Sequence, residues 1–564
     1  MKKYLLVLVS LCCALLPALA EHPEYPELKK SDANIIGHVL DKKTSEHLPY
    51  ITIALKGTTI GTVTDATGHY FLKNLPEGKF TLEYKALGYK TVTRSVTLKK
   101  GKTLEENFEL EEDAIALDGV VVSANRSETT RRLAPTLVNV VDLKLFETTN
   151  SSTLSQGLNF QPGVRVETNC QNCGFQQVRI NGLDGPYTQI LIDSRPVFSA
   201  LSGVYGLEQI PASMIERVEV MRGGGSALFG SSAIAGTINI ITKEPLRNSG
   251  QLSHTITSIG GSSAFDNNTS LNASLVTDDH RAGLYIFGQN RHRSGYDYDG
   301  DGFTELPKLK NQTVGFRSYL KTSTYSKLTF EYHHMQEFRR GGDMLDRPPH
   351  EAHIAEQLQH SIDGGSLKYD YFSPNEKNRL SVFASAANTD RDSYYGPGND
   401  PLKAYGKTTD LTAMGGVQYV HTFDKCLFMP SDLTAGLEYN RDRLKDNMWG
   451  YDRHTDQTVK VYSAFLQNEW KNKHWGILIG GRLDKHNMVD DVIFSPRANL
   501  RFNPTDNINL RLSYSSGFRA PQAFDEDMHI ENVGGTVAMI ERAKDLKEEK
   551  SQSFSASADM YHRF

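Results

Sequence analysis

Two short clusters in this sequence have residue types that could bind a metal ion. In the first, Asp297, Asp299 and Asp301 alternate along the chain and a glycine follows them. This spacing lets carboxylates converge on calcium while the glycine makes a sharp turn. Lys308 stands where a complete EF-hand loop has its bidentate glutamate, although Glu305 could contribute a ligand. The pattern predicts either a structural calcium loop or a solvated acidic loop.

The second cluster is a Cys-x-x-Cys motif formed by Cys170 and Cys173. In an exported protein such a pair favours a local disulfide, and the amino terminus described below predicts export. A redox function would need a thioredoxin-like βαβ unit around the motif. Metal capture is the lesser alternative, because no second Cys/His pair lies at zinc spacing in the sequence. Cys426 is left over.

Histidines suggest a haem or metal site only at first sight. His333 and His334 are adjacent, and neighbouring residues of a strand face opposite sides, so both cannot enter one site. His350, His353 and His360 are expected to be single surface residues. No Ser-His-Asp, paired-carboxylate or cofactor motif stands out, and the sequence therefore predicts a protein that is not an enzyme.

Length, charge and the amino terminus define the class of protein. A chain of 564 residues is too long for one ordinary core. Its net charge of −5 makes nucleic acid a poor partner. Residues 1–20 have two lysines, an apolar run and an Ala-Leu-Ala end, which is typical of a signal peptide; lipidation at Cys12 or Cys13 is the lesser alternative. Beyond it no apolar run is long enough for a membrane-spanning helix.

After a polar, flexible lead-in over residues 21–34, short β-rich runs alternate with turns, which predicts a small β-sandwich. The opening Gly37–Asp41, the turn Thr64–Tyr70 and the pair Gly88-Tyr89 resemble the carboxypeptidase-regulatory-like module. The resemblance covers residues 35–110 and implies an accessory domain without catalytic residues.

The most informative stretch runs from Val178 to Lys243. It holds three short apolar runs separated by Gly, Pro and Ser, which predict buried strands bounded by turns. Its segments RING and IPASMIERVEVMRGGGSALFGSSAIAGTINIIT resemble the plug domain of TonB-dependent outer-membrane receptors. The resemblance implies an α+β plug over residues 127–245. The positions that match the plug motif are Arg179, Asn181, Gly182, Glu216, Arg217, Glu219, Arg222, Gly223, Gly230 and Gly236.

A phosphate-binding loop is the alternative for the glycine-rich segment from Arg222 to Gly230. No Gly-Lys-Ser/Thr closes that segment. We therefore expect its glycines to permit positive-φ turns and close backbone approach.

Residues 111–126 are predicted to be a linker with an extended, β-branched stretch. Such a stretch could be an edge strand of the preceding domain, or a strand left free for another protein to pair with. The plug resemblance favours the second interpretation and implies a TonB box. Its residues are Leu117, Asp118, Gly119, Val120, Val121, Val122, Ser123 and Ala124.

From residue 246 to 564 apolar and polar residues alternate in about fourteen segments of roughly ten residues, the length of a tilted membrane strand. We predict an all-β membrane barrel preceded by the plug and the small sandwich. The family closes its barrel with twenty-two strands, and Phe518–Pro521 resembles a box that relatives carry well before their end. The expectation is a fragment or a C-terminally truncated reading frame; a smaller closed barrel is the alternative, since an open edge cannot face lipid.

The resemblance implies energised uptake of a scarce metal chelate: a ferric siderophore, cobalamin or haem. It implies an outer-membrane location with the plug and N-terminal domain facing the periplasm. The expected partners are the TonB-ExbB-ExbD complex, the chelate, outer-membrane lipid and a surface lipoprotein, with no nucleic acid. Beyond a structural calcium ion no cofactor is expected, and no substrate residues are assigned. An adhesin-like barrel without transport and a non-functional remnant are the alternatives.

Overall fold

The structure is a computed structural model that describes residues 30–560 with short gaps. The gaps are residues 50, 66, 87–88, 113–119, 169, 171, 175, 197–207, 209, 278, 398–403, 524–527, 534–535, 539–540, 542 and 544. The predicted signal peptide and the first nine residues of the lead-in lie outside the described part. Among the described helices, none has the length and apolar character needed to cross a membrane.

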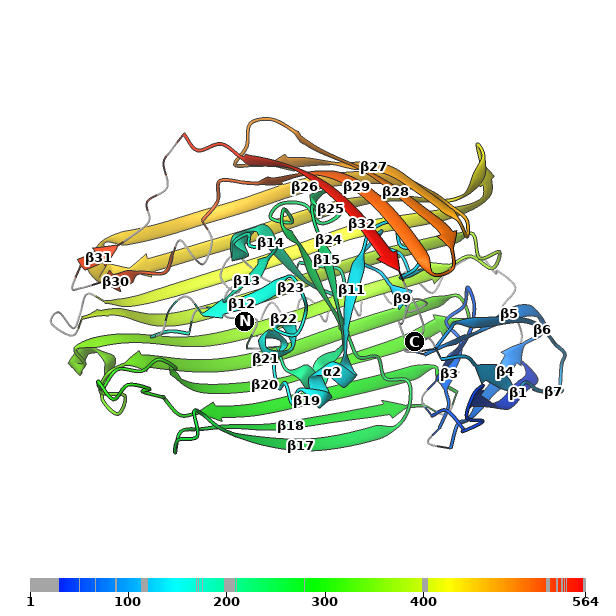
Figure 1. Ribbon diagram of the computed structural model, residues 1–564, viewed down its shortest axis with the longest axis horizontal. Helices are drawn as coiled ribbons and strands as arrows, with labels where there is room; N and C mark the ends of the chain where they lie inside the picture. The colour runs from blue at the N-terminus through cyan, green and yellow to red at the C-terminus, as the bar shows by residue number, and fades with distance from the viewer. Residues whose placement is uncertain are drawn as a thin grey trace.

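A small β-sandwich lies at one end of the molecule, drawn in blue in Figure 1. Its two sheets have the orders β4-β1-β7, with β8 beside β1, and β3-β2-β5-β6. Alternate residues of both sheets, among them Ile35, Ile53 and Tyr84, fill one shared core, so the predicted sandwich is confirmed. The strands are β1 (Lys30–Asp41), β2 (Thr52–Leu55), β3 (Gly61–Val63), β4 (His69–Pro76), β5 (Gly78–Lys85), β6 (Val92–Leu98), β7 (Thr103–Glu105) and β8 (Phe108–Leu110).

The first strand starts earlier than the sequence predicts. Residues 30–34, expected to be flexible, already belong to β1. Ala33 is fully buried, and the Ser31 hydroxyl donates a 2.8 Å hydrogen bond to the carbonyl oxygen of Leu75. The prediction was wrong here because the polar side chains of these residues give no strand pattern in the sequence. Their strand forms by pairing with β4 and β7.

The plug has a four-stranded mixed sheet of order β11-β15-β16-β14 and lies inside the curve of a much larger sheet (Figure 1). The three predicted apolar runs are β14, β15 and β16, whose aliphatic side chains form the plug core. The elements are β9 (Val120–Val121), β10 (Thr129–Thr130), β11 (Val138–Asp142), α2 (Leu143–Thr148), α3 (Leu154–Leu158), β12 (Val164–Thr168), β13 (Gln176–Ile180), η1 (Gly185–Tyr187), β14 (Thr188–Ile192), η2 (Ala212–Met214), β15 (Ile215–Arg222), α5 (Ser226–Phe229) and β16 (Gly236–Thr242).

Fourteen antiparallel strands form the large sheet, as the alternation predicts. They run in chain order from β17 to β29 and then β32. The strands are β17 (Ser249–Ser258), β18 (Phe265–Val276), β19 (Ala282–Arg293), β20 (Lys308–Ser323), β21 (Ser326–Gly342), β22 (Ile354–Phe372), β23 (Asn378–Pro397), β24 (Tyr405–Cys426), β25 (Met429–Met448), β26 (Arg453–Lys471), β27 (Trp475–His486), β28 (Ile493–Thr505), β29 (Ile508–Arg519) and β32 (Glu549–Met560). Shorter elements in the connections are η3 (Pro349–Glu351), η4 (Trp449–Tyr451), β30 (Glu531–Val533) and β31 (Thr536–Ala538).

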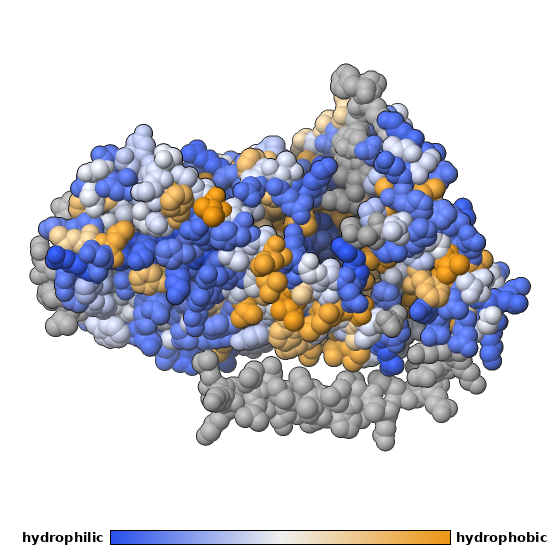
Figure 2. Space-filling view, turned by 90° about the horizontal axis from the view of Figure 1, so that it is seen from below, coloured by the Kyte–Doolittle hydropathy of each residue, from blue (hydrophilic) through white to orange (hydrophobic). Residues whose placement is uncertain are grey.

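The large sheet is polar inside and apolar outside, the reverse of a water-soluble core. In β28 the side chains of Arg497 and Arg501 are buried against the interior, whereas Phe494 and Leu500 are exposed. Figure 2 shows hydrophobic side chains gathered near the middle of one face, with a mainly hydrophilic surface toward the left of that view. This is the surface of a membrane barrel wall.

The sheet forms an open arc. Its order ends at β17 on one side and β32 on the other, and no pairing joins the two among the described strands. The alternative of a smaller closed barrel is therefore not what the described chain forms.

Candidate functional site

Five of the eight residues of the predicted TonB box, Val120 to Ala124, belong to the part of the chain that the structure describes. Leu117, Asp118 and Gly119 lie outside the described residues, whereas Val120 and Val121 form β9. This strand pairs with β10 in a two-residue antiparallel ladder. The box therefore continues directly into ordered structure that leads to the plug.

Glu219 of the plug motif holds the end of the box. One oxygen of its fully buried carboxylate accepts hydrogen bonds from the backbone amides of Val122 and Ser123, both at 2.9 Å, and from the Ser123 hydroxyl at 2.7 Å. Its other oxygen accepts from Arg217 at 3.0 Å. Asn239 of β16 donates to the Ser123 hydroxyl at 3.0 Å. A buried carboxylate needs such partners, so the box end and the plug sheet share one polar network.

The next residues of the chain are bound to the barrel wall. The Arg497 guanidinium donates to the carbonyl oxygen of Ala124 at 2.9 Å. The side-chain amide of Asn125 donates to Glu469 at 2.6 Å, and the backbone carbonyl oxygen of Asn125 accepts from Gln467 at 2.8 Å. Residues 122–126 are therefore held by the plug on one side and by β26 and β28 on the other. We call this segment the junction.

Arg126 completes the junction. Its guanidinium pairs with Glu438 of β25 and lies over the rings of Phe229, at 5.0 Å, and Phe465, at 4.7 Å. Arg482 of β27 binds the other oxygen of Glu438 at 2.7 Å and donates to the backbone of α5. Phe229 belongs to α5, so the plug helix, the junction and the wall meet at one buried charge cluster.

On another side the plug is attached to the wall by ion pairs. Glu208 contacts the guanidinium groups of Arg291, Arg293 and Arg339 at 3.3, 3.2 and 2.8 Å. Burial raises the pKa of Glu208, but these three cations reverse the effect and hold it at about 2. Asp193 pairs with Arg317 of β20 at 2.6 Å. Both plug carboxylates are thus ionised anchors to the wall.

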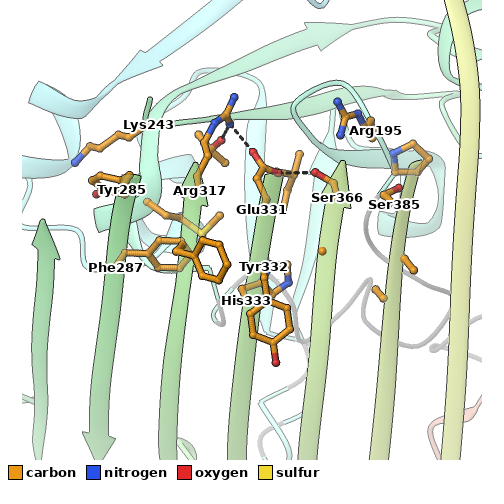
Figure 3. Close-up of a pocket in the computed structure, with 18 of the residues that line it drawn as sticks. Arg195, Lys243, Tyr285, Phe287, Arg317, Glu331, Tyr332, His333, Ser366 and Ser385 are labelled. Atoms are coloured by element: carbon orange, nitrogen blue, oxygen red, sulfur yellow. Dashed lines mark hydrogen bonds and ion pairs between the residues drawn. The ribbon is translucent and has the colours of Figure 1, made fainter. Parts of the chain in front are cut away.

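Arg317 borders a cavity between plug and wall, shown in Figure 3. Arg317 of β20 also pairs with Glu331 of β21 at 2.6 Å, and Glu331 accepts from Ser366 of β22 at 2.9 Å. Arg195 faces them from the plug (Figure 3). The cavity volume is about 40 Å³, which holds a few water molecules and no metal chelate.

The remaining plug-motif residues shape the backbone. Asn181 and Gly182 form a turn with φ of 53° and 82°, and Gly223 and Gly230 have φ of 84° and 83°. A Cβ on Gly236 would lie 2.4 Å from a backbone oxygen of β15. The glycines thus occupy positive-φ turns and a close approach. Three of the motif's charged residues form local contacts: Arg179 with Glu167 and Asp184, and Glu216 with Arg217.

Cys170 and Cys173 are both thiols in the structure, so the predicted disulfide is not formed there. The Cys173 amide donates to the sulfur of Cys170 at 3.4 Å, and each thiol also has a partner from the wall side of the site. Cys170 donates to Glu356 at 3.1 Å, and the sulfur of Cys173 lies 3.3 Å from Nε2 of His529. Sequence reasoning missed Glu356 and His529, because nothing in the sequence relates them to the cysteines. A hydrogen bond with the Cys173 side chain is the main cause that lowers the pKa of Cys170 to about 7.

The acidic loop differs in detail from the predicted calcium set. Carboxylate oxygens of Asp297, Asp299 and Glu305 lie within 4.8 Å of one another. Asp301 is absent from this group; its carboxylate accepts from the Phe303 amide at 2.8 Å. The contribution of Glu305, which the sequence left open, is therefore geometrically favoured.

The histidines confirm one expectation and contradict another. His333 lines the cavity of Figure 3, whereas His334 does not and contacts Asp363 at 2.9 Å, so the two do not enter one site. His360 is not a surface residue: it is buried beside Glu337, at 3.6 Å. It lies on the polar inner face of the sheet, which sequence alternation alone cannot distinguish from a solvated face.

Known protein families match nearly the whole described chain. A model described as TonB dependent receptor-like, beta-barrel matches residues 236–564. The TonB-dependent Receptor Plug Domain matches residues 130–237, and the CarboxypepD_reg-like domain matches residues 35–122.

Individual relatives are transporters and receptors. The vitamin B12 transporter BtuB of Vibrio vulnificus (strain CMCP6) is 24% identical over 72% of this chain and 64% of its own length. The ferric enterobactin receptor of Pseudomonas aeruginosa is 23% identical over 72% of this chain and 61% of its own length. The chain thus spans less than two thirds of these relatives.

A solved structure shows the same fold. The siderophore receptor PirA from Acinetobacter baumannii has a TM-score of 0.65 and 19% identity, covering 77% of this chain and 69% of its own. Because the barrel model alone matches more than half of the sequence and the plug model matches the stretch before it, this chain belongs to the TonB-dependent receptor family.

Proposed function

We propose that this chain serves the uptake of a scarce metal chelate across the outer membrane. A ferric siderophore, cobalamin or haem is the expected cargo. The substrate class is supported by the similarity to a vitamin B12 transporter and to siderophore receptors. The wall's polar interior and apolar exterior support a membrane location.

The observation that carries the proposal is the contact of Glu219 with Val122 and Ser123. In transport, the TonB-ExbB-ExbD complex would pair with residues 117–124 and pull. Binding of the cargo can shift the plug only by its differential affinity for two states, so outside work is needed to open a path. The Glu219 contacts would pass that work to the plug sheet.

The contacts of the N-terminal domain support an orientation toward the periplasm. The Thr59 amide donates to the carbonyl oxygen of Thr324 at 2.8 Å, and Thr62 lies 3.1 Å from His280. Both partners belong to short turns of the wall, and outer-membrane barrels place short turns in the periplasm. The long connections would then face outward, where a surface lipoprotein could cover them.

Deleting residues 117–124 tests the transport proposal. Cells carrying the deletion are given cyanocobalamin, ferric enterobactin or haem, and surface binding and internal accumulation are measured separately. Transport predicts that accumulation collapses while binding survives. If the bound ligand still accumulates in cells with the deletion, TonB-driven transport is refuted. If cells with the unaltered chain and cells with the deletion both bind the ligand but neither accumulates it, the adhesin-like alternative is supported.

We also propose that Asp297, Asp299 and Glu305 form a structural calcium loop, on the strength of their convergent carboxylates. Removing calcium with a chelator should speed proteolysis in residues 294–307. Asp299→Asn should make cleavage of this segment independent of calcium, whereas cleavage that never depended on calcium would contradict the site.

A further inference from the structure

Four residues from distant parts of the sequence converge at the tip of the plug. They are Cys170 and Cys173 of the plug, Glu356 of β22, and His529 from the segment that follows β29. One ligand atom of each residue lies within 4.8 Å of all the others. Nε2 of His529 lies 3.5 Å from the Glu356 carboxylate. Four donors at such distances can surround a single ion.

The chemistry of the four donors is selective. Two thiols, an imidazole and a carboxylate form the mixed sulfur, nitrogen and oxygen set that tetrahedral zinc uses. With metal–sulfur bonds of about 2.3 Å, two thiolates in a tetrahedron lie about 3.8 Å apart. The distances of 3.1, 3.3 and 3.5 Å between sulfur, nitrogen and oxygen atoms of the cluster are close to the edges of such a tetrahedron. Calcium and magnesium prefer oxygen ligands only, so they fit poorly.

The surroundings hold the four side chains in place. Cys173 is 1% exposed and Glu356 is 4% exposed. Leu358, Tyr395 and Ile530 form an apolar shell around them, and the Tyr395 ring meets the His529 ring edge-on at 5.4 Å. Thiols are weak hydrogen-bond partners, so a buried carboxylate facing them is better satisfied by a cation.

A glycine lets the cysteine loop reach the wall. A Cβ on Gly341 of β21 would lie 1.9 Å from the carbonyl oxygen of Asn172, between the two cysteines. Arg339 of the same strand donates to the carbonyl oxygen of Gly174 at 3.3 Å. The loop is therefore seated against β21, which brings its thiols to Glu356 on the neighbouring strand.

We propose that Cys170, Cys173, Glu356 and His529 bind one divalent transition-metal ion of the zinc type. The bound ion joins the plug tip to the wall and to the segment after β29, so plug movement requires loss of at least one ligand. This inference does not depend on the transport proposal, because it concerns binding by the folded chain itself.

Cobalt(II) is a suitable probe, since its thiolate charge-transfer and tetrahedral d–d absorption report the ligand set directly. The full chain, purified in detergent, reduced and checked for β-structure by circular dichroism, is titrated with Co²⁺ and then with Zn²⁺. We expect one equivalent of cobalt with a thiolate spectrum, displaced by zinc. Cys170→Ser with Cys173→Ser should weaken binding at least about 100-fold, because even changes outside the ligand sphere cost 10–100-fold.

Cys426→Ser is the matched control and should bind like the unaltered chain, because Cys426 lies outside the cluster. His529→Ala should keep the thiolate band but change the d–d bands and weaken zinc. A reduced, folded, unaltered chain that shows no thiolate–cobalt band overturns the proposal. So does a band that survives the double cysteine substitution. Chelator-stripped chain that refills with zinc supports it.

Discussion

At the scale of single residues, Glu219 links the box end to the plug. It belongs to the plug motif, yet its type alone does not reveal that role. Glu216 lies three positions earlier on the same strand, is half exposed and pairs with Arg217 at 2.9 Å. Burial, rather than charge, separates the residue that holds the junction from the one that does not.

We expect Glu219→Gln to loosen the junction. The amide loses the charge-assisted bonds to the amides of Val122 and Ser123, at a cost of about 1–3 kcal/mol. Hydrogen exchange of these two amides should speed up roughly 5- to 150-fold. Glu216→Gln is the control and should leave their exchange unchanged. Equal effects of the two substitutions would show that Glu219 has no special role.

At the scale of elements, the alternation of apolar and polar residues predicts all fourteen wall strands, because each has one lipid-facing side. It underestimates their length: β24 has 22 residues where about ten were expected. The strands also extend into the connections between them: β21 reaches Gly342 and β22 begins at Ile354. Strand ends beyond the membrane lack the apolar signal and are fixed by pairing with their neighbours.

The turn between β3 and β4 offers a test by pH. Asp65 accepts from the Thr67 hydroxyl at 2.7 Å and from the amides of Thr67 and His69 at 2.8 and 3.0 Å. The Thr67 hydroxyl is the main cause that lowers the pKa of Asp65. A lowered folded-state pKa stabilises the domain above the unfolded value, and that contribution is lost as the pH falls through the folded pKa.

Residues 30–112 have their own core, so the excised domain should unfold cooperatively in urea. Asp65→Asn should destabilise it by at most about 1 kcal/mol at neutral pH, since the group is exposed. The difference from the unaltered domain should shrink as the pH is lowered below about 4. Thr67→Val should reproduce part of the loss. A difference that grows on acidification would contradict the assigned sign.

At the scale of the whole molecule, the domains could be predicted from the sequence, but the contacts between residues of different domains could not. His529 is 356 residues from Cys173, and Arg126 is 312 residues from Glu438. Local patterns carry no information on such pairs, which depend on how the plug is seated in the wall. The cysteines are another example: they form no disulfide in the structure, and the partners Glu356 and His529 beside them come from elsewhere in the chain.

The proposed orientation makes opposite ends of the wall accessible from opposite sides. In a chain whose cysteines are replaced by serine, Asp299→Cys places a thiol in a long connection, and Asp424→Cys places one near the end of β24, beside the short turn to β25. A membrane-impermeant maleimide should label position 299 in intact cells, and position 424 only after the outer membrane is opened. The reverse pattern would invert the proposed topology.

The two-residue pairing of β9 with β10 implies an order in which contacts would break when the chain is pulled from its N-terminal side. Val120 pairs with Thr130, and Val121 with Thr129, so tension entering from residue 119 reaches the open end of this short ladder first. It would peel the ladder pair by pair, at low force, before loading the Glu219 contacts in shear. The wall contacts of Asn125 and Arg126 come last along the chain. In such a graded linkage, a weak or brief pull would separate only the β9–β10 pairs, which can form again. Only a stronger or longer pull would be transmitted to the plug sheet.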